Sequence, residues 1–68
     1  MIPNGAAIRS FREARGLSLR RLAHLIGIHP SCLSRIETGQ RGATDRTLRT
    51  AAEVLQVPLN AIHKETTP

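Results

Sequence analysis

Aromatic residues are almost missing from this 68-residue chain, which has no tryptophan, no tyrosine and one phenylalanine, Phe11. Any core must therefore be built from leucine, isoleucine, valine and alanine. The single cysteine, Cys32, excludes an internal disulfide framework and fits a reducing cytosol. Long apolar runs are also missing, and no stretch resembles a signal peptide or a membrane span. We therefore expect a soluble, cytoplasmic protein that does not contact a membrane.

Residue patterns typical of catalysis are absent as well. The sequence has no pair of carboxylates, no nucleophile with a base and no glycine-rich phosphate loop. His24, His29 and Cys32 lack a fourth ligand, and their spacing is poor for zinc. A chain of this length has room for one small domain, without a deep cleft between subdomains. We expect no enzymatic activity, no metal site, no cofactor and no small-molecule ligand.

Positive charge is concentrated in one part of the chain. Residues 9–49 contain nine arginines against three acidic residues, whereas residues 50–68 contain one lysine against two glutamates. A basic region of this kind is typical of a protein that binds a polyanion. The excess of arginine over lysine favours flat, bidentate contacts with phosphate or guanine. A GC-rich genome also enriches arginine, so charge favours nucleic-acid binding without deciding for it.

Glycine and proline breaks divide the apolar residues into five segments with helical spacing. We expect helices over about residues 6–15, 19–26, 30–37 and 45–55, and a short fifth helix over residues 59–62. No stretch shows sustained strand alternation, so the expected class is all-α. The expected domain covers residues 6–63, with frayed termini at 1–5 and 64–68. The side chains expected to face inward are Ile8, Phe11, Ala14, Leu22, Ala23, Ile26, Leu33, Ile36, Leu48, Ala51, Ala52 and Leu55.

The second and third segments are short helices joined by a glycine-containing turn, with the apolar Ile28 in it. This is the sequence signature of a helix-turn-helix. Ala23 would let the two helices approach closely, while Leu33 and Ile36 would anchor the third. Arg35, on the opposite face, could then reach guanine O6 and N7 in a major groove. The outward face of the third segment consists of Pro30, Ser31, Ser34 and Arg35.

Three motifs in this region resemble the Cro/repressor-type, or XRE-like, helix-turn-helix family. They are R-x-x-x-G-L-S at residues 12–18, L-A-x-x-I-G-I at 22–28 and L-S-R-I-E-x-G at 33–39. With a downstream L-x-x-A-A-x-x-L-x-V-P at 48–58, the resemblance covers residues 8–62. It implies a compact five-helix, lambda-repressor-like bundle whose recognition helix, residues 30–37, enters the major groove. The implied function is a sequence-specific regulator of transcription that binds double-stranded DNA, with a repressor as the expected kind.

The same resemblance implies roles for individual residues. Arg12 and Glu37 match a structural pair that ties the first helix to the end of the recognition helix. The positions that match base-contacting ones are Pro30, Ser31, Ser34 and Arg35. The positions expected to contact phosphate are Ser18, Arg20, His29, Thr38, Gln40, Arg41, Thr44 and Arg46.

Some positions depart from the family pattern. Leu19 replaces a glutamine that usually contacts phosphate, His29 replaces a serine or threonine cap, and Gln56 replaces a glycine after the fourth helix. Leu25 occupies a position that is usually polar. These departures leave the operator sequence unpredicted.

Two partner types fit the sequence. A single module would bury only about 600–1,000 Å² on DNA, so we expect a weak homodimer on two operator half-sites about one helical turn apart. Leu59 and Ile62 are the expected self-contact. The alternative is an antitoxin-like or adaptor protein whose main role is to bind a protein partner. Exposed Leu19 and Leu25 would favour that alternative, although six residues separate them and place them on different faces.

Overall fold

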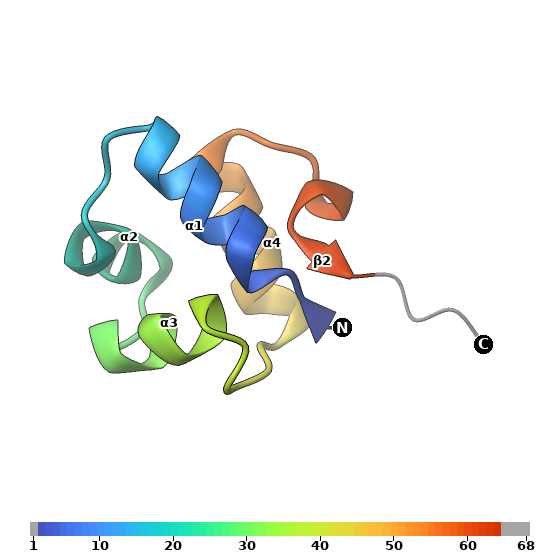
Figure 1. Cartoon of the computed structure of the whole chain (residues 1–68). Helices are drawn as coiled ribbons and strands as arrows, with labels where there is room; N and C mark the ends of the chain where they lie inside the picture. Colours follow the sequence, from blue (N-terminus) through green and yellow to red (C-terminus); the bar gives the residue numbers. More distant parts are fainter. Residues whose placement is uncertain (1, 65–68) are drawn as a thin grey trace.

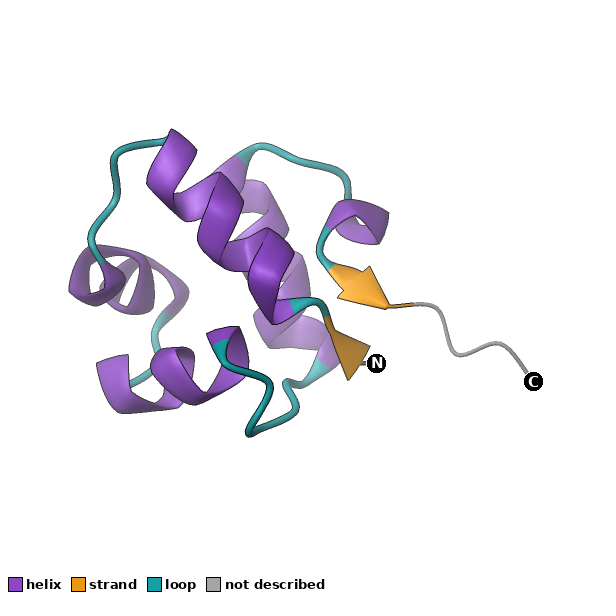
Figure 2. Cartoon of the chain, in the orientation of Figure 1, coloured by secondary structure: helices purple, strands orange, loops and turns teal. Residues whose placement is uncertain are grey.

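A computed structural model describes residues 2–64 of the chain. Figure 1 shows α1 crossing α4, with α2 and α3 on one side of this pair and the strand β2 on the other. Figure 2 separates the helices from two short strands that lie next to each other. In chain order the elements are β1 (Ile2–Pro3), α1 (Gly5–Ala14), α2 (Leu19–Ile26), α3 (Pro30–Glu37), α4 (Asp45–Leu55), the 3-10 helix η1 (Leu59–Ala61) and β2 (His63–Lys64).

Each α-helix begins at a side chain that accepts a hydrogen bond from a backbone N–H of the first turn. Such a cap satisfies a donor that has no partner within the helix. Its position in the sequence therefore decides where each helix can start. The caps are Asn4 for α1, Ser18 for α2, His29 for α3 and Thr44 for α4.

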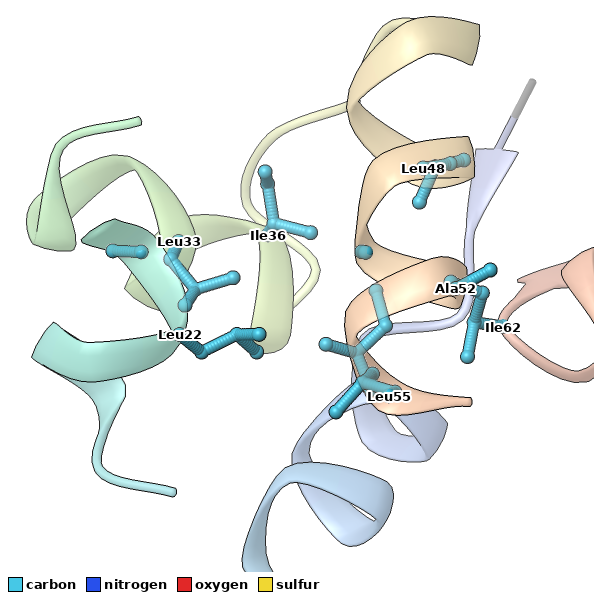
Figure 3. Close-up of a cluster of buried hydrophobic side chains, with 10 residues drawn as sticks. Leu22, Leu33, Ile36, Leu48, Ala52, Leu55 and Ile62 are labelled. Carbon is cyan, nitrogen blue, oxygen red and sulfur yellow. The ribbon is translucent and has the colours of Figure 1, made fainter. Parts of the chain in front are cut away.

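The core lies where α2 and α3 meet α4. Figure 3 shows Leu22, Leu33 and Ile36 directed towards the side of α4 that carries Leu55. The inward faces expected for α3 and α4 are confirmed, and Ile26 of α2 is half-buried against the core. Ala14 was expected inward but is exposed, since it lies in the last turn of α1. The buried hydrophobic residues are Ile8, Leu22, Ala23, Leu33, Ile36, Leu48, Ala51, Ala52, Leu55 and Ile62.

The expected fifth helix is wrong, because residues 59–61 form a single 3-10 turn. Pro58 at its start has no backbone N–H to donate, and the chain leaves the turn at Ile62 to enter β2. The structure thus has four α-helices in its described residues.

The two ends of the described chain form a small antiparallel sheet, which the all-α expectation missed. Ile2 is opposite Lys64 and Pro3 is opposite His63. Residues 2–3 and Lys64 are therefore in strands, although they were assigned to frayed termini. Two-residue strands are too short to show the alternation that marks a strand in a sequence. Met1 and residues 65–68, also expected to be frayed, lie outside the described residues.

The strand pair places the start of α1 against the end of α3. The N–H of Asn4 donates to the carbonyl of Ile62 at 2.8 Å. Directly after it, Gly5 lies so close to α3 that an added Cβ would collide with the backbone oxygens of Ile36 and Glu37. None of the helices within residues 2–64 is long and apolar enough to cross a membrane.

Candidate nucleic-acid interface

The turn between α2 and α3 has the geometry of a helix-turn-helix. Gly27 ends α2 with φ 88° and ψ 31°, a left-handed conformation that glycine adopts without steric cost. The N–H of Ile28 then donates back to the carbonyl of Ala23 at 3.0 Å. Ala23 is completely buried, so only a small side chain fits at this point. The turn therefore sets the direction in which α3 leaves α2.

The outer face of α3 contains the four residues expected to contact bases. Ser31 and Arg35 are exposed, and Pro30 and Ser34 are half-buried. Leu33 and Ile36 lie on the opposite face in the core, so the core fixes which face of α3 is free. A helix with small polar groups and one arginine on its free face can lie in a major groove.

The end of α3 is held by Arg12 of α1. Its Nε donates to Oε2 of Glu37 at 2.8 Å, and its Nη2 donates to Oε1 at 3.1 Å. Nη1 donates to the carbonyl of Leu17 at 2.9 Å, which ties in the segment between α1 and α2. The two charged side chains are only 13% and 5% exposed. This is the structural pair that the resemblance implies.

The protonation state of Arg12 follows from its surroundings. The hydrogen bond with Glu37 raises the pKa of the Arg12 guanidinium above its ordinary value. Burial acts in the opposite direction, and the negative charges of Glu37 and Glu13 add to the rise. The guanidinium therefore stays charged, as a bidentate pair with a carboxylate requires.

The residues expected to contact phosphate lie at helix starts and in the loop after α3. All of them are exposed. Ser18 Oγ accepts from the N–H of Arg21 at 3.0 Å and Thr44 Oγ1 from that of Thr47 at 3.1 Å. Ser18 and Arg20 lie at the start of α2, Thr44 and Arg46 at the start of α4, His29 before α3, and Thr38, Gln40 and Arg41 in or next to the loop.

Two of the residues expected to contact phosphate line one groove. Arg41 and Thr44 line a groove of about 430 Å³ between α3 and the start of α4, and Cys32 and Ile28 lie along it as well. Gln40 and Arg41 also border a smaller groove next to Ile2. The loop between α3 and α4 therefore holds these polar residues close to the recognition helix.

Several arginines form no ion pair with a carboxylate in the part of the chain that the structure describes. Within residues 2–64, the ion pairs of arginine are those of Arg9 with Glu13 and of Arg12 with Glu37. The expected DNA-contacting arginines, Arg20, Arg35, Arg41 and Arg46, are exposed and take part in neither pair. Their charges add to the positive field of the chain.

Some residues that shape the site could not be found from the sequence. Arg15 donates from Nε to the carbonyl of Leu55 at 2.9 Å and so stabilises the end of α4. Gly5 permits the contact between α1 and α3 described above. Both contacts join residues far apart in the chain, and no local pattern marks them. The cap at Asn4 did have a signal, because asparagine before a helical segment is a common cap.

Two expectations about apolar contacts are corrected. Ile62 was expected to contact a second copy, but it is completely buried in the core of its own chain. Leu19 would have favoured a protein partner if it were exposed, but it is half-buried and packs against the core. Leu25 remains exposed, at 39%.

Known proteins are similar to this chain over most of its length. A family model described as helix-turn-helix matches residues 8–62. The Bacillus subtilis (strain 168) protein described as uncharacterized HTH-type transcriptional regulator RghRB is 41% identical over 59 residues, which are 85% of this chain and 42% of that protein. The HTH-type transcriptional repressor RghR of the same organism is 36% identical over 59 residues, 85% of this chain and 44% of that protein. The chain thus spans less than half the length of these curated relatives.

A solved structure agrees with this result. SinR, the master regulator for biofilm formation from Bacillus subtilis, has been solved in complex with DNA. That structure matches with a TM-score of 0.77 and 32% identity, over 82% of this chain and 90% of that chain. The resemblance drawn from the three motifs is confirmed. Because the family model spans most of its length, the chain belongs to the Cro/repressor-type helix-turn-helix family.

Proposed function

We propose that this chain, a DNA-binding transcriptional regulator of the helix-turn-helix family, is a repressor that occupies a specific double-stranded operator. The recognition helix α3 would enter the major groove. The observation that carries the proposal is the orientation of α3, whose inner face is buried and whose end is held by Arg12 and Glu37. This support leaves only its small, polar outer face free.

The two kinds of DNA contact follow from where the residues lie. Ser31, Ser34 and Arg35, with Pro30 beside them, would contact base edges, because they share the free face of α3. Pro30 offers only apolar contact, for example to a thymine methyl group. The exposed residues at the helix starts and in the loop after α3 would contact phosphate, which positions the protein without reading sequence.

Binding as a pair of chains is part of the proposal. One recognition helix covers one half-site, so an operator of two half-sites about one helical turn apart needs two copies. The buried position of Ile62 excludes it as the contact between copies. Leu59 and Val57 are half-buried and border a groove with Gln56 and Arg49, so this surface is the proposed place of a weak self-contact. As a DNA-binding regulator it would act in the cytoplasm of a bacterial cell.

The alternative of an antitoxin-like or adaptor protein has less support. Leu25 is the exposed leucine that favours it, whereas Leu19 packs against the core. A single exposed leucine is normal on a protein surface. DNA binding, rather than a protein contact, accounts for the exposed arginines.

The proposal can be tested by selecting bound duplexes from a random DNA library with the purified chain. We expect enrichment of one sequence, arranged as two related half-sites. Arg35→Ala should lose the preference at one base position while the protein stays folded. Absence of any enriched sequence would contradict the proposal and favour a protein partner.

A further inference from the structure

The cap of the recognition helix is a histidine, and its hydrogen bonds determine where its proton lies. His29 Nδ1 is 3.1 Å from the backbone nitrogen of Ser31, which can only donate. A ring nitrogen accepts a hydrogen bond only when it carries no proton. A neutral His29 therefore carries its proton on Nε2, at the other side of the ring.

The hydroxyl group of Ser31 is oriented by the same nitrogen. Ser31 Oγ lies 2.8 Å from His29 Nδ1. In the tautomer with its proton on Nε2, Nδ1 offers only its lone pair, so the hydroxyl is the donor in this contact and shares that lone pair with the N–H of Ser31. The proton of Ser31 is thus directed back to the cap of its own helix, and only the lone pairs of Oγ are free for another molecule.

We propose that His29 is a positioning residue that makes Ser31 a pure hydrogen-bond acceptor, so that Ser31 selects a base with an exocyclic amine. This inference rests on the proposed function, in which α3 lies in the major groove. Adenine N6 and cytosine N4 are donors there, whereas guanine O6 and thymine O4 are acceptors. Ser31 therefore favours adenine or cytosine on the strand that it faces and disfavours guanine or thymine. A serine with a free hydroxyl would accept from or donate to either kind.

A phosphate contact of His29 would reinforce this arrangement. Within residues 2–64, no hydrogen bond occupies Nε2, and the residue is exposed. A phosphate oxygen can only accept, so it binds His29 at Nε2–H and requires the proton there. The same proton position makes Nδ1 the acceptor for Ser31. Binding of the DNA backbone and orientation of the base-reading hydroxyl thus depend on one tautomer.

The first test measures the tautomer in the protein without DNA. Nitrogen-15 NMR of the full chain at mildly alkaline pH distinguishes a protonated from an unprotonated ring nitrogen. We expect an unprotonated Nδ1 in His29. A proton on Nδ1 would overturn the inference, since Ser31 would then receive a hydrogen bond and keep its own proton free. This measurement does not depend on DNA or on any variant.

The second test measures base preference with randomised half-sites. For the wild type we expect adenine or cytosine to be favoured about threefold to tenfold at one position, the effect of one hydrogen bond. Ser31→Ala should remove the preference at that position alone. A preference for guanine or thymine there, or no position that responds to Ser31→Ala, would overturn the inference.

Variants at the cap separate His29 from Ser31. His29→Ala frees the hydroxyl. The ratio of affinities for adenine or cytosine over guanine or thymine at this position should therefore fall towards one, although Ser31 is present. His24→Ala removes an exposed histidine at the end of α2 and should leave the preference unchanged. An unchanged preference in His29→Ala would overturn the role of His29. If His29→Ala does not fold, His29→Gly, which the start of a helix tolerates with little loss, also leaves the hydroxyl without an acceptor, and an unchanged base preference in it would overturn the role of His29.

The outcomes distinguish this inference from the proposed function. If the wild type enriches no sequence at all, the proposed function fails, and the role of Ser31 in reading DNA fails with it. If it enriches a sequence that depends on Arg35 but shows no preference for adenine or cytosine at the Ser31 position, only the inference fails.

Discussion

Arg12 and Glu37 meet through two hydrogen bonds across 25 residues of sequence, and their side chains are almost entirely withdrawn from water. The contact joins the first helix to the last residue of the recognition helix. It therefore controls the orientation of α3 from its C-terminal end, while His29 caps the other end.

Removing one member of the pair should destabilise the fold strongly. Glu37→Ala leaves the charge of Arg12 without its partner in a mostly buried place, so the free energy of unfolding should fall by about 3 kcal/mol. Urea denaturation followed by circular dichroism measures this loss in the free energy of unfolding. The control is Glu13→Ala, which breaks the exposed pair with Arg9 and should change stability by less than about 1 kcal/mol. Equal losses in the two variants would show that burial of the Arg12 pair does not matter.

Alanine at position 5 should be harmful although alanine favours helices. The new Cβ would collide with the backbone oxygens of Ile36 and Glu37, and backbone atoms cannot easily move away. We expect a loss of about 1–3 kcal/mol, as for overpacking elsewhere. Gly42→Ala is the matched control, since a Cβ there meets nothing within 4 Å. A thermal melt compares the two, and similar melting temperatures would contradict the close packing of α1 on α3.

Glycine at position 56 should stabilise the protein. Gln56 ends α4 with φ 58° and ψ 45°, a left-handed conformation that a residue with a Cβ adopts at a cost. Glycine avoids that cost but loses more entropy on folding, so the net gain should be about 0.5–1 kcal/mol. The reverse change at the end of α2, Gly27→Ala, places a Cβ at φ 88° and should destabilise. Chemical denaturation of both variants gives the signs, and a loss of stability in Gln56→Gly would refute the prediction.

Replacing Arg35 by alanine should change DNA binding in a different way from replacing Arg41 by alanine. Arg35 lies on the free face of α3, so its loss should cost about 1–3 kcal/mol per half-site and flatten the preference at one base position. Arg41 lies in the loop after α3, so its loss should weaken binding to all sequences and reduce the salt slope by about 1 per subunit. Affinities for cognate and scrambled duplexes, measured at several salt concentrations, distinguish the loss of a base contact from the loss of a phosphate contact. If both variants lose affinity equally on the two duplexes, Arg35 does not read a base.

The sequence alone determined the four α-helices, the inward faces of α3 and α4 and the helix-turn-helix. These features depend on interactions between near neighbours in the chain. Leu33 and Ile36 share a face because a helix turns every 3.6 residues, and Ser18 can cap α2 because it directly precedes it. Spacing of this kind is visible in the residues themselves, and so are the motifs that indicated the family.

The tertiary structure alone decided the contacts between distant segments. Pairing of Ile2–Pro3 with His63–Lys64 needs both ends of the chain in one place, and two-residue strands leave no periodic signal. The same holds for Ile62, which looks like an apolar residue at the edge of the domain until the fold places it in the core. The orientation of the Ser31 hydroxyl likewise depends on a side-chain geometry at His29 that residue types do not specify. Local periodicity decides where helices form, whereas packing decides what their faces and ends touch.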